Sequence, residues 1–205
     1  MTTISIIGAG TMANAIGTRA AKHGHTVELL SRDTAKAQAL ADQIGHGATV
    51  GTYGARPAGD IVIVAVLHQH AVAVIEQFGD ALADKVLVDI TNPFNADGTG
   101  IVTSEGSSVA QQIAAVAPRG AQVVKALNTI FGHVIAADGP LDAFFAGSSA
   151  EAKAQVAAFL KGIGMRPLDV GGLAETYAVE WAAILLMGLA RNGAGFDAAL
   201  AANLP

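Results

Sequence analysis

Gly8-Ala9-Gly10-Thr11-Met12-Ala13 directly follows the apolar run Ile4-Ser5-Ile6-Ile7, and this stretch decides the fold. A Gly-x-Gly-x-x-Ala turn between a first strand and a first helix has a physical use. Gly8 allows the tight turn, Gly10 lets the backbone approach a pyrophosphate without a Cβ in the way, and Ala13 lets the helix pack close to the strand. The free N–H groups at the helix N-terminus and its positive dipole end then point at the phosphates.

The residues after this turn complete a βαβ opening. Small and apolar residues between 15 and 21 have helical spacing, and His23-Gly24-His25 is a stop signal. A second strand over residues 26–31 follows at once. Strand, turn, helix and strand in this order favour dinucleotide binding over glycines that only serve packing.

Strand-like runs alternate with helical segments along the rest of the chain. Strands are expected at residues 3–7, 26–31, 48–51, 60–66, 85–90, 121–125, 142–146 and 166–170. Capped helices are expected over 34–44 after Asp33, up to Val116 after Ser107 or Ser108, and up to Leu160 after Ser148 or Ser149. The Gly- and Pro-rich connection 52–59 is expected to hold little or no helix. This pattern predicts an α/β fold of the Rossmann type, with a doubly wound, mainly parallel sheet.

The composition bounds the class of protein. Of the 205 residues 52% are hydrophobic and only 14% are charged, which suggests that apolar surface is hidden in an oligomer. The net charge of −5 and the lack of a Lys/Arg cluster argue against a nucleic-acid partner. The chain has no cysteine, which excludes disulfides, thiolate nucleophiles and Cys-ligated metals. Because the N-terminus enters a strand immediately, no signal peptide is expected, and the predicted location is cytoplasmic.

The end of the second strand indicates which dinucleotide is bound. NAD-binding versions of this fold place an acidic side chain there for the ribose hydroxyls, but here the position reads Ser31-Arg32. Glu28 lies about three residues too early, inside the strand, and helix capping explains Asp33. A hydroxyl and a guanidinium suit a 2′-phosphate, and Lys36 adds charge one helical turn later. We therefore expect NADP rather than NAD.

Polar groups follow three further strands, where the carboxyl ends of a doubly wound sheet bind ligands. Residues 66–70, 91–95 and 126–130 are expected to line the nicotinamide half of the cleft and the surface opposite it. His68 and His70 diverge by about 200° on a helix, so a metal site is not expected. His68 is the expected cleft residue and His70 a helix-surface residue. Hydride transfer needs orientation, contact distance and exclusion of water, not a nucleophile–base pair.

At these motifs the chain resembles the NADPH-dependent reductases of coenzyme F420, whose N-terminal domain is shared with pyrroline-5-carboxylate reductase. The resemblance rests on the glycine turn, Ser31-Arg32-Asp33 with Lys36-Ala37, Asp89–Pro93, Val124–Thr129, Gly164–Gly171 and Arg191–Gly195. It implies that Thr11, Ser31 and Arg32 contact NADP and that a deazaflavin stacks against the nicotinamide. The predicted cofactor-binding residues are Gly8, Gly10, Thr11, Met12, Ala13, Ser31, Arg32, Lys36, Val66, Leu67, His68, Asn92 and Pro93, with His68 and Asn128 as cleft candidates and no metal ligand.

The last segment is expected to be helical from about residue 174 onward. Its uncharged apolar stretch, Trp181–Ala190, is too short to span a bilayer, so no membrane partner is expected. A helix that is apolar nearly all round must be covered on both sides, which predicts a homodimer through the C-terminal helices. We thus expect a single NADP-binding domain over 1–205, in which 174–205 complete the cleft and the dimer interface.

Three functions fit these features. The first is hydride transfer between NADP(H) and a flat redox partner such as coenzyme F420 or a flavin. The second is NADPH-dependent reduction of a small carbonyl or imine compound, with His68 or Asn128 binding the oxygen. The third is an NADP(H)-binding sensor without turnover.

Overall fold

The computed structural model describes residues 2–204, which form an eight-stranded sheet in the order β3-β2-β1-β4-β5-β6-β7-β8. The strands are β1 (Thr3–Ile7), β2 (Thr26–Leu30), β3 (Thr49–Val50), β4 (Ile61–Val64), β5 (Val86–Asp89), β6 (Gln122–Lys125), β7 (Leu141–Gly147) and β8 (Met165–Gly171). Every neighbouring pair is parallel except β6 and β7. All eight expected strands are present, with ends that shift by at most two residues.

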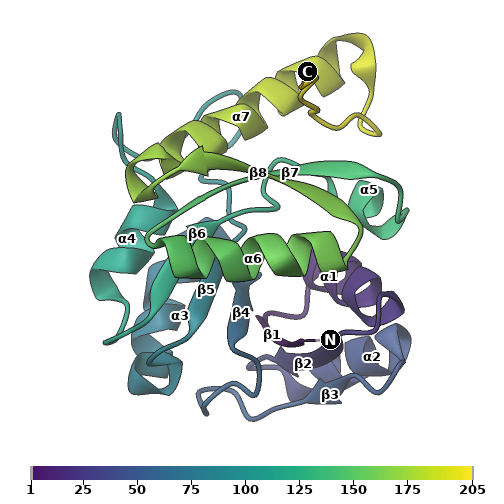
Figure 1. The fold of residues 1–205 in the computed structure, drawn as a ribbon, viewed down its shortest axis with the longest axis vertical. Helices are drawn as coiled ribbons and strands as arrows, with labels where there is room; N and C mark the ends of the chain where they lie inside the picture. Colours follow the sequence, from purple (N-terminus) through teal and green to yellow (C-terminus); the bar gives the residue numbers. More distant parts are fainter. Residues whose placement is uncertain (1, 205) are drawn as a thin grey trace.

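Helices cover both faces of this sheet (Figure 1). They are α1 (Thr11–Lys22), α2 (Thr34–Ile44), α3 (His68–Phe78), α4 (Val109–Val116), α5 (Gly132–Ala136), α6 (Ala150–Gly162) and α7 (Thr176–Leu189), with shorter turns η1 (Gly79–Leu82), η2 (Leu173–Glu175) and η3 (Ala190–Ala194). The expected caps are confirmed, because the side chains of Asp33, Ser108 and Ser149 each accept a backbone N–H at the start of a helix. The connection 52–59 contains turns and no helix, as expected.

The central strands are buried on both faces, so their residues alternate between two hydrophobic cores. Ile61 and Ile63 of β4 belong to the core under α1, α2 and α6, whereas Val62 and Val64 belong to the core under α3 and α4. This is why the strand reads as an unbroken apolar run. Both cores fix the position of β4 next to β1.

The chain reverses its direction of winding between β1 and β4. From β1 it proceeds outward to β2 and β3, and then crosses to β4 and continues toward β8. The carboxyl ends of β1 and β4 therefore open into the crevice in which doubly wound sheets bind ligands. The turn at residues 8–13 and the segment at 65–68 stand on either side of it.

The C-terminal segment differs from the expectation of helix throughout. Helical structure ends at Ala194, where Gly193 and Gly195 adopt φ of 113° and 75°, and residues 195–204 have no helix. This tail instead runs to the start of β7, where the Ala202 N–H donates to Asp142 Oδ2 at 2.8 Å. Left-handed glycines end a helix because they turn the chain away from its axis.

The last helix is also longer than its uncharged stretch. Residues Leu173–Ala194 form a helical segment of 22 residues with a kink at Asn192 and Gly193. By length and composition alone this segment is long and apolar enough to cross a membrane, and 33% of its most apolar 18 residues are buried. Figure 1 shows α7 beside β7 and β8, at the end of the molecule away from α2 and β3. One face packs there, while Trp181 and Leu185 on the other face are 50% and 58% exposed. Within residues 2–204 the rest of the chain thus covers one face of α7, and the predicted cover of the other face by a second protomer stays a prediction.

Candidate functional site

The glycine turn has the geometry that an anion site requires. Gly8 adopts φ of 128°, and a Cβ there would overlap the carbonyl oxygen of Ala65, so only glycine fits. At Gly10 a Cβ would meet no atom within 4 Å, so this position faces open space. Gly10 is also the N-cap of α1 and offers no side chain to its first N–H groups. These groups are therefore free to bind a phosphate, and the buried Ala13 lies behind them.

A cavity of about 310 Å³ extends from this turn to the end of β2. It brings together three of the predicted side chains, Ser31, Arg32 and Lys36. Ser31 Oγ accepts the Asp33 N–H at 3.2 Å, and Asp33 caps α2 through the Lys36 N–H at 2.9 Å. The cations are consequently held at the start of α2 while Asp33 is occupied with capping.

Tyr53 and His70 are among the lining residues of this cavity that were not predicted to bind the cofactor. The rings of Tyr53 and Phe78 form a T-shaped pair with their centroids 4.9 Å apart. The Tyr53 hydroxyl donates to Gln77 Oε1 at 3.3 Å. His70 is exposed on α3, as expected of a helix-surface residue, and it also lines the cavity from the first turn of that helix. Its spacing from Leu67 was the available signal, since residues three apart share a helix face.

Glu28 is unavailable to a ribose, as its place inside β2 predicted. Its Oε2 accepts the Ser5 hydroxyl at 2.5 Å and the Ala58 N–H at 2.8 Å. Ser5 Oγ in turn accepts the Gly59 N–H. This carboxylate therefore ties β2 and β1 to the connection before β4.

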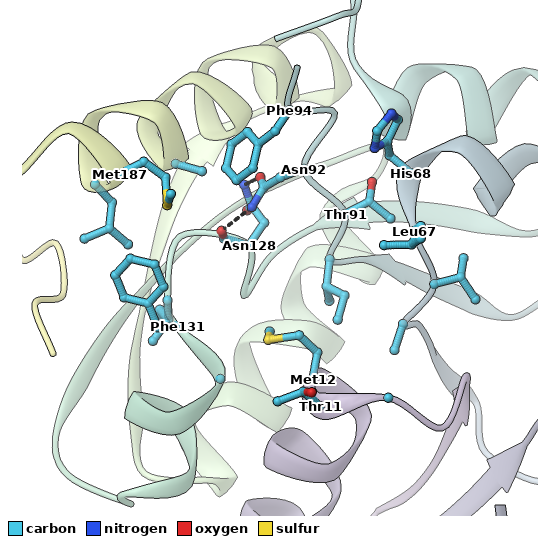
Figure 2. Close-up of a pocket in the computed structure, with 18 residues that line it drawn as sticks. Thr11, Met12, Leu67, His68, Thr91, Asn92, Phe94, Asn128, Phe131 and Met187 are labelled. Carbon is cyan, nitrogen blue, oxygen red and sulfur yellow. Dashed lines mark hydrogen bonds between the residues drawn. The ribbon is translucent and has the colours of Figure 1, made fainter. Parts of the chain in front are cut away.

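A second cavity of about 480 Å³ opens on the other side of the turn (Figure 2). Of the predicted residues it is lined by Gly10, Thr11, Met12, Val66, Leu67, His68, Asn92 and Asn128, whereas Pro93 lies outside its lining. Phe94 belongs to the predicted segment 91–95, whereas Phe131 and Met187 were missed; all three lie across from Leu67 and His68 in Figure 2. Phe94 and Phe131 each come two or three residues after a predicted polar position, but Met187 is brought in by α7 alone.

Within residues 2–204, the His-x-His pair is divided between the two cavities. His68 lines the larger cavity and His70 the smaller one. No three His, Cys, Asp or Glu side chains gather to hold a metal in this part of the chain. No Asp, Glu, Lys or Arg of these described residues lines the larger cavity.

Asn92 and Asn128 interlock at the wall of the larger cavity. Asn92 Nδ2 donates to the Asn128 carbonyl at 2.8 Å, and Asn128 Nδ2 donates to Asn92 Oδ1 and to the Val179 carbonyl, both at 3.0 Å. The dashed line in Figure 2 joins this pair. Both N–H groups of Asn128 are thus engaged, so its amide is arranged to hold α7 against the cleft rather than to donate to a substrate oxygen. Its Oδ1 is buried without a partner.

Behind this wall lies a buried cluster of charges: Asp89 at the end of β5, Lys125 at the end of β6, and Glu180 on α7. All three are fully buried. Lys125 Nζ donates to Asp89 Oδ2 and to Glu180 Oε1, each at 2.8 Å, and also to the Thr91 carbonyl. Asp89 Oδ1 accepts the Thr91 N–H at 2.8 Å. The cluster thus fixes the backbone of Thr91, which lines the cavity.

Glu180 is the member of the cluster with a buried oxygen that has no hydrogen-bond partner. Its Oε1 also accepts the Val109 N–H at 2.9 Å, while Oε2 is buried with no partner. Burial raises the pKa of this carboxyl above its ordinary value, and the Lys125 charge opposes the shift. The Glu180 carboxyl is therefore less readily ionised than an exposed glutamate.

Comparisons with known proteins identify related chains. The family model described as NADP oxidoreductase coenzyme F420-dependent matches residues 3–93. The metalloreductase STEAP3 of Rattus norvegicus is 29% identical over 180 residues, covering 86% of this chain and 35% of that protein. The chain therefore spans about a third of the length of this curated relative.

Two solved structures share the fold. A protein of Arthrobacter sp. FB24, provisionally assigned as an F420-dependent NADP reductase, gives a TM-score of 0.82 at 24% identity, covering 96% of this chain and 97% of that one. A reductive aminase from Aspergillus terreus, in complex with NADPH and ethyl-5-oxohexanoate, gives 0.65 at 25% identity, covering 96% and 64%. The family model agrees with the resemblance expected from the sequence over residues 3–93, and the Arthrobacter structure shows that the fold is shared over nearly the whole chain.

Proposed function

We propose that this protein transfers hydride between NADP(H) and a flat redox partner, such as coenzyme F420 or a flavin. The observation that carries the proposal is one crevice with two chemically different ends. The two cavities meet at Gly10 and at residues 65–67. One end carries Arg32 and Lys36, whereas the other is lined mainly by apolar and aromatic side chains and, among the described residues, by no Asp, Glu, Lys or Arg.

The smaller cavity fits the 2′-phosphoadenosine end of NADP. Ser31 would donate a hydrogen bond and Arg32 would bind the phosphate or stack on adenine, while Lys36 adds a second charge. The free N–H groups at the start of α1 would hold the pyrophosphate. The open space at Gly10 leaves room for that contact. The nicotinamide would then enter the larger cavity beside Thr11, Met12, Leu67 and His68.

The larger cavity suits a flat, uncharged ring opposite the nicotinamide. NADPH supplies the hydride when it is bound. Met12, Phe94, Phe131 and Met187 would orient the second ring and exclude water, which is what a hydride transfer requires. A small carboxylic acid would find no counter-charge among the described lining residues.

A second candidate is the reduction of a small carbonyl or imine compound. The fold shared with an NADPH-binding reductive aminase favours it. His68 and the Thr91 hydroxyl would then donate to the substrate, because the Asn128 amide N–H groups are engaged elsewhere. An NADP(H)-binding sensor without turnover is the third candidate.

An anaerobic titration separates these candidates. The protein is mixed with NADPH and, in turn, with F420, FMN and a panel of ketones and imines, and the absorbance of NADPH and of the acceptor is followed. Oxidation of NADPH with bleaching of F420 or FMN supports the first candidate. Oxidation only with the ketones or imines supports the second, and binding without any oxidation supports the third.

A pair of variants locates the second substrate. Met187→Arg places a long cation in the larger cavity and is expected to abolish turnover while NADPH binding falls less than three-fold. Leu204→Arg adds the same charge in the exposed tail and is the matched control. Equal losses of turnover in both variants, or none in Met187→Arg, would contradict the assignment of this cavity.

The assembly and location are part of the same proposal. The exposed face of α7 carries Tyr177, Trp181, Leu185 and Leu189, spaced four residues apart. This apolar stripe supports a symmetric homodimer through the C-terminal helices. The opposite face of α7 brings Ala183, Leu186 and Met187 to the cavity. A second protomer would therefore pack against the side of α7 that faces away from the cavity. A cytoplasmic location, with neither nucleic acid nor membrane as partner, accords with the net charge of −5 and the redox substrates proposed.

A further inference from the structure

The buried cluster of Asp89, Lys125 and Glu180 has more negative than positive groups. Lys125 is the single cation and faces two carboxyl groups, all fully buried. When Glu180 is ionised, the cluster carries one net negative charge. Burying charges costs free energy even when they are paired, so the cluster is not explained by stability alone.

This cluster is separated from the larger cavity by Thr91, which contacts Lys125 and lines the cavity. Lys125 Nζ reaches the Thr91 carbonyl and lies 3.5 Å from the Thr91 hydroxyl. Thr91 itself lines the larger cavity, in which the nicotinamide is proposed to lie. In the low-dielectric interior a charge at this depth acts on a ligand in the cavity with little screening by salt.

The nicotinamide ring carries a positive charge when it is oxidised and none when it is reduced. We propose that the Asp89–Lys125–Glu180 cluster presents a net negative charge to the nicotinamide end of the cleft and thereby favours binding of NADP⁺ relative to NADPH. The inference rests on the proposed NADP(H) site. It assigns to this cluster an effect on the relative affinities for NADP⁺ and NADPH, although the cluster contacts neither cofactor form.

Glu180 is the adjustable member of the cluster. The groups that face it are Lys125 of β6, Asp89 of β5, the Val109 N–H at the start of α4, and the Ser108 and Thr176 hydroxyl pair beside that N-terminus. Burial raises the pKa of Glu180. A positive ring in the cavity favours the ionised carboxylate, so NADP⁺ binding drives proton release where the reduced cofactor does not.

The test compares the dissociation constants of NADP⁺ and NADPH at pH 8 for the wild type and Glu180→Gln, which keeps the shape of the side chain and removes its charge. NADP⁺ is expected to bind about five-fold more weakly to the variant, whereas NADPH changes less than two-fold. This loss corresponds to a rise of about 20 mV in the potential of the bound couple, since tenfold equals 29.6 mV for two electrons. Glu151→Gln, the same change at an exposed position of α6, is the control.

A measurement on the wild type alone covers the case in which Glu180→Gln fails to fold. Calorimetry in two buffers of different ionisation enthalpy counts the protons released on binding. More protons are expected to be released with NADP⁺ than with NADPH. Proton exchange by the 2′-phosphate contributes equally to both measurements, because both forms carry this group. Equal proton release, or equal loss of both cofactors in the variant, overturns the inference. If the wild type binds neither cofactor form, it is the proposed function that fails.

Discussion

Arg32 and Lys36 bring two cations to a cavity that also begins at the free helix end of the glycine turn. The charges of Arg32 and Lys36 act locally, because both residues lie at the start of α2, where Asp33 is engaged as the helix cap. A phosphate ester placed among these groups gains charge-assisted hydrogen bonds, which are the stronger class of hydrogen bond. Single substitutions at these residues should therefore weaken the binding of NADPH more than the binding of NADH.

Replacing Arg32 by Ala is expected to weaken NADPH binding by about ten- to a hundred-fold, the range of a hydrogen bond to a charged group. NADH binding should change less than three-fold, because NADH has no 2′-phosphate. Fluorescence titration of both cofactors measures this. Arg56→Ala removes an exposed arginine that is outside the cavity lining and serves as control. An equal loss of affinity for NADPH and NADH would contradict a contact between Arg32 and the 2′-phosphate.

Glu180 should make the stability of the protein depend on pH. Its pKa in the folded protein is raised above the ordinary 4.5, so the folded state binds this proton more tightly than the unfolded chain. The stability due to the neutral carboxyl is full below pH 4.5 and is lost as pH rises through the raised pKa. Urea unfolding from pH 4.5 to 8 should show wild type losing free energy of unfolding relative to Glu180→Gln. A difference that stays constant with pH would show that Glu180 does not titrate in this range.

At the scale of elements, α7 has two faces with different roles. Ala183, Leu186 and Met187 line the cavity, while Trp181 and Leu185 are exposed on the opposite side. The element is anchored inward by Glu180 and by the Val179 carbonyl, which accepts from Asn128. The outer face carries none of these contacts, so it can be changed without unfolding the helix.

Leu185→Glu is expected to convert a dimer into a monomer. The new carboxylate would be buried without a partner at a symmetric interface, whereas it is solvated in the monomer. Light scattering measures the mass, and the melting temperature measured on the monomer should change little because Leu185 is 58% exposed. Ala154→Glu, at an exposed position of α6, should leave the mass unchanged. A monomeric wild type would remove the proposed interface.

At the scale of the whole molecule, the crevice joins elements that are distant in the chain. The turn after β1, the segment after β4, the loops after β5 and β6, and α7 all contribute to one cavity. A ligand bound there links both cores through the sheet. Binding to the folded state alone raises the free energy of unfolding of the entire domain.

NADPH at a hundred times its dissociation constant should stabilise the protein by about 2.7 kcal/mol, which corresponds to roughly 5–10 °C in melting temperature for a chain of this size. Gly10→Val should retain the melting temperature without ligand, because a Cβ there meets no protein atom within 4 Å. It should lose the NADPH-dependent rise, because its side chain occupies the space proposed for the pyrophosphate. A rise of equal size in both proteins would contradict that placement.

Local patterns in the sequence determined the fold and one end of the site. The glycine turn, the apolar strands and the capping residues act through short-range sterics and hydrogen bonds, so all eight strands and three helix caps were predicted correctly. Ser31, Arg32 and Lys36 line one cavity, and their contact with NADP stays a prediction. The tail was not, because residues 195–204 follow left-handed glycines and are held by Asp142, far away in the chain.

Only the tertiary structure decided what lines the larger cavity, in which the nicotinamide is proposed to lie. His70 enters the smaller cavity, Met187 enters the larger one, and the Asn128 amide is engaged by α7, because each depends on how elements pack across the sheet. The burial of Lys125 between two carboxyl groups has the same origin. Contacts between residues that are distant in the chain leave no periodic signal in one sequence. The sequence by itself therefore determined the fold and the dinucleotide turn, while packing decided the chemistry of the second cavity.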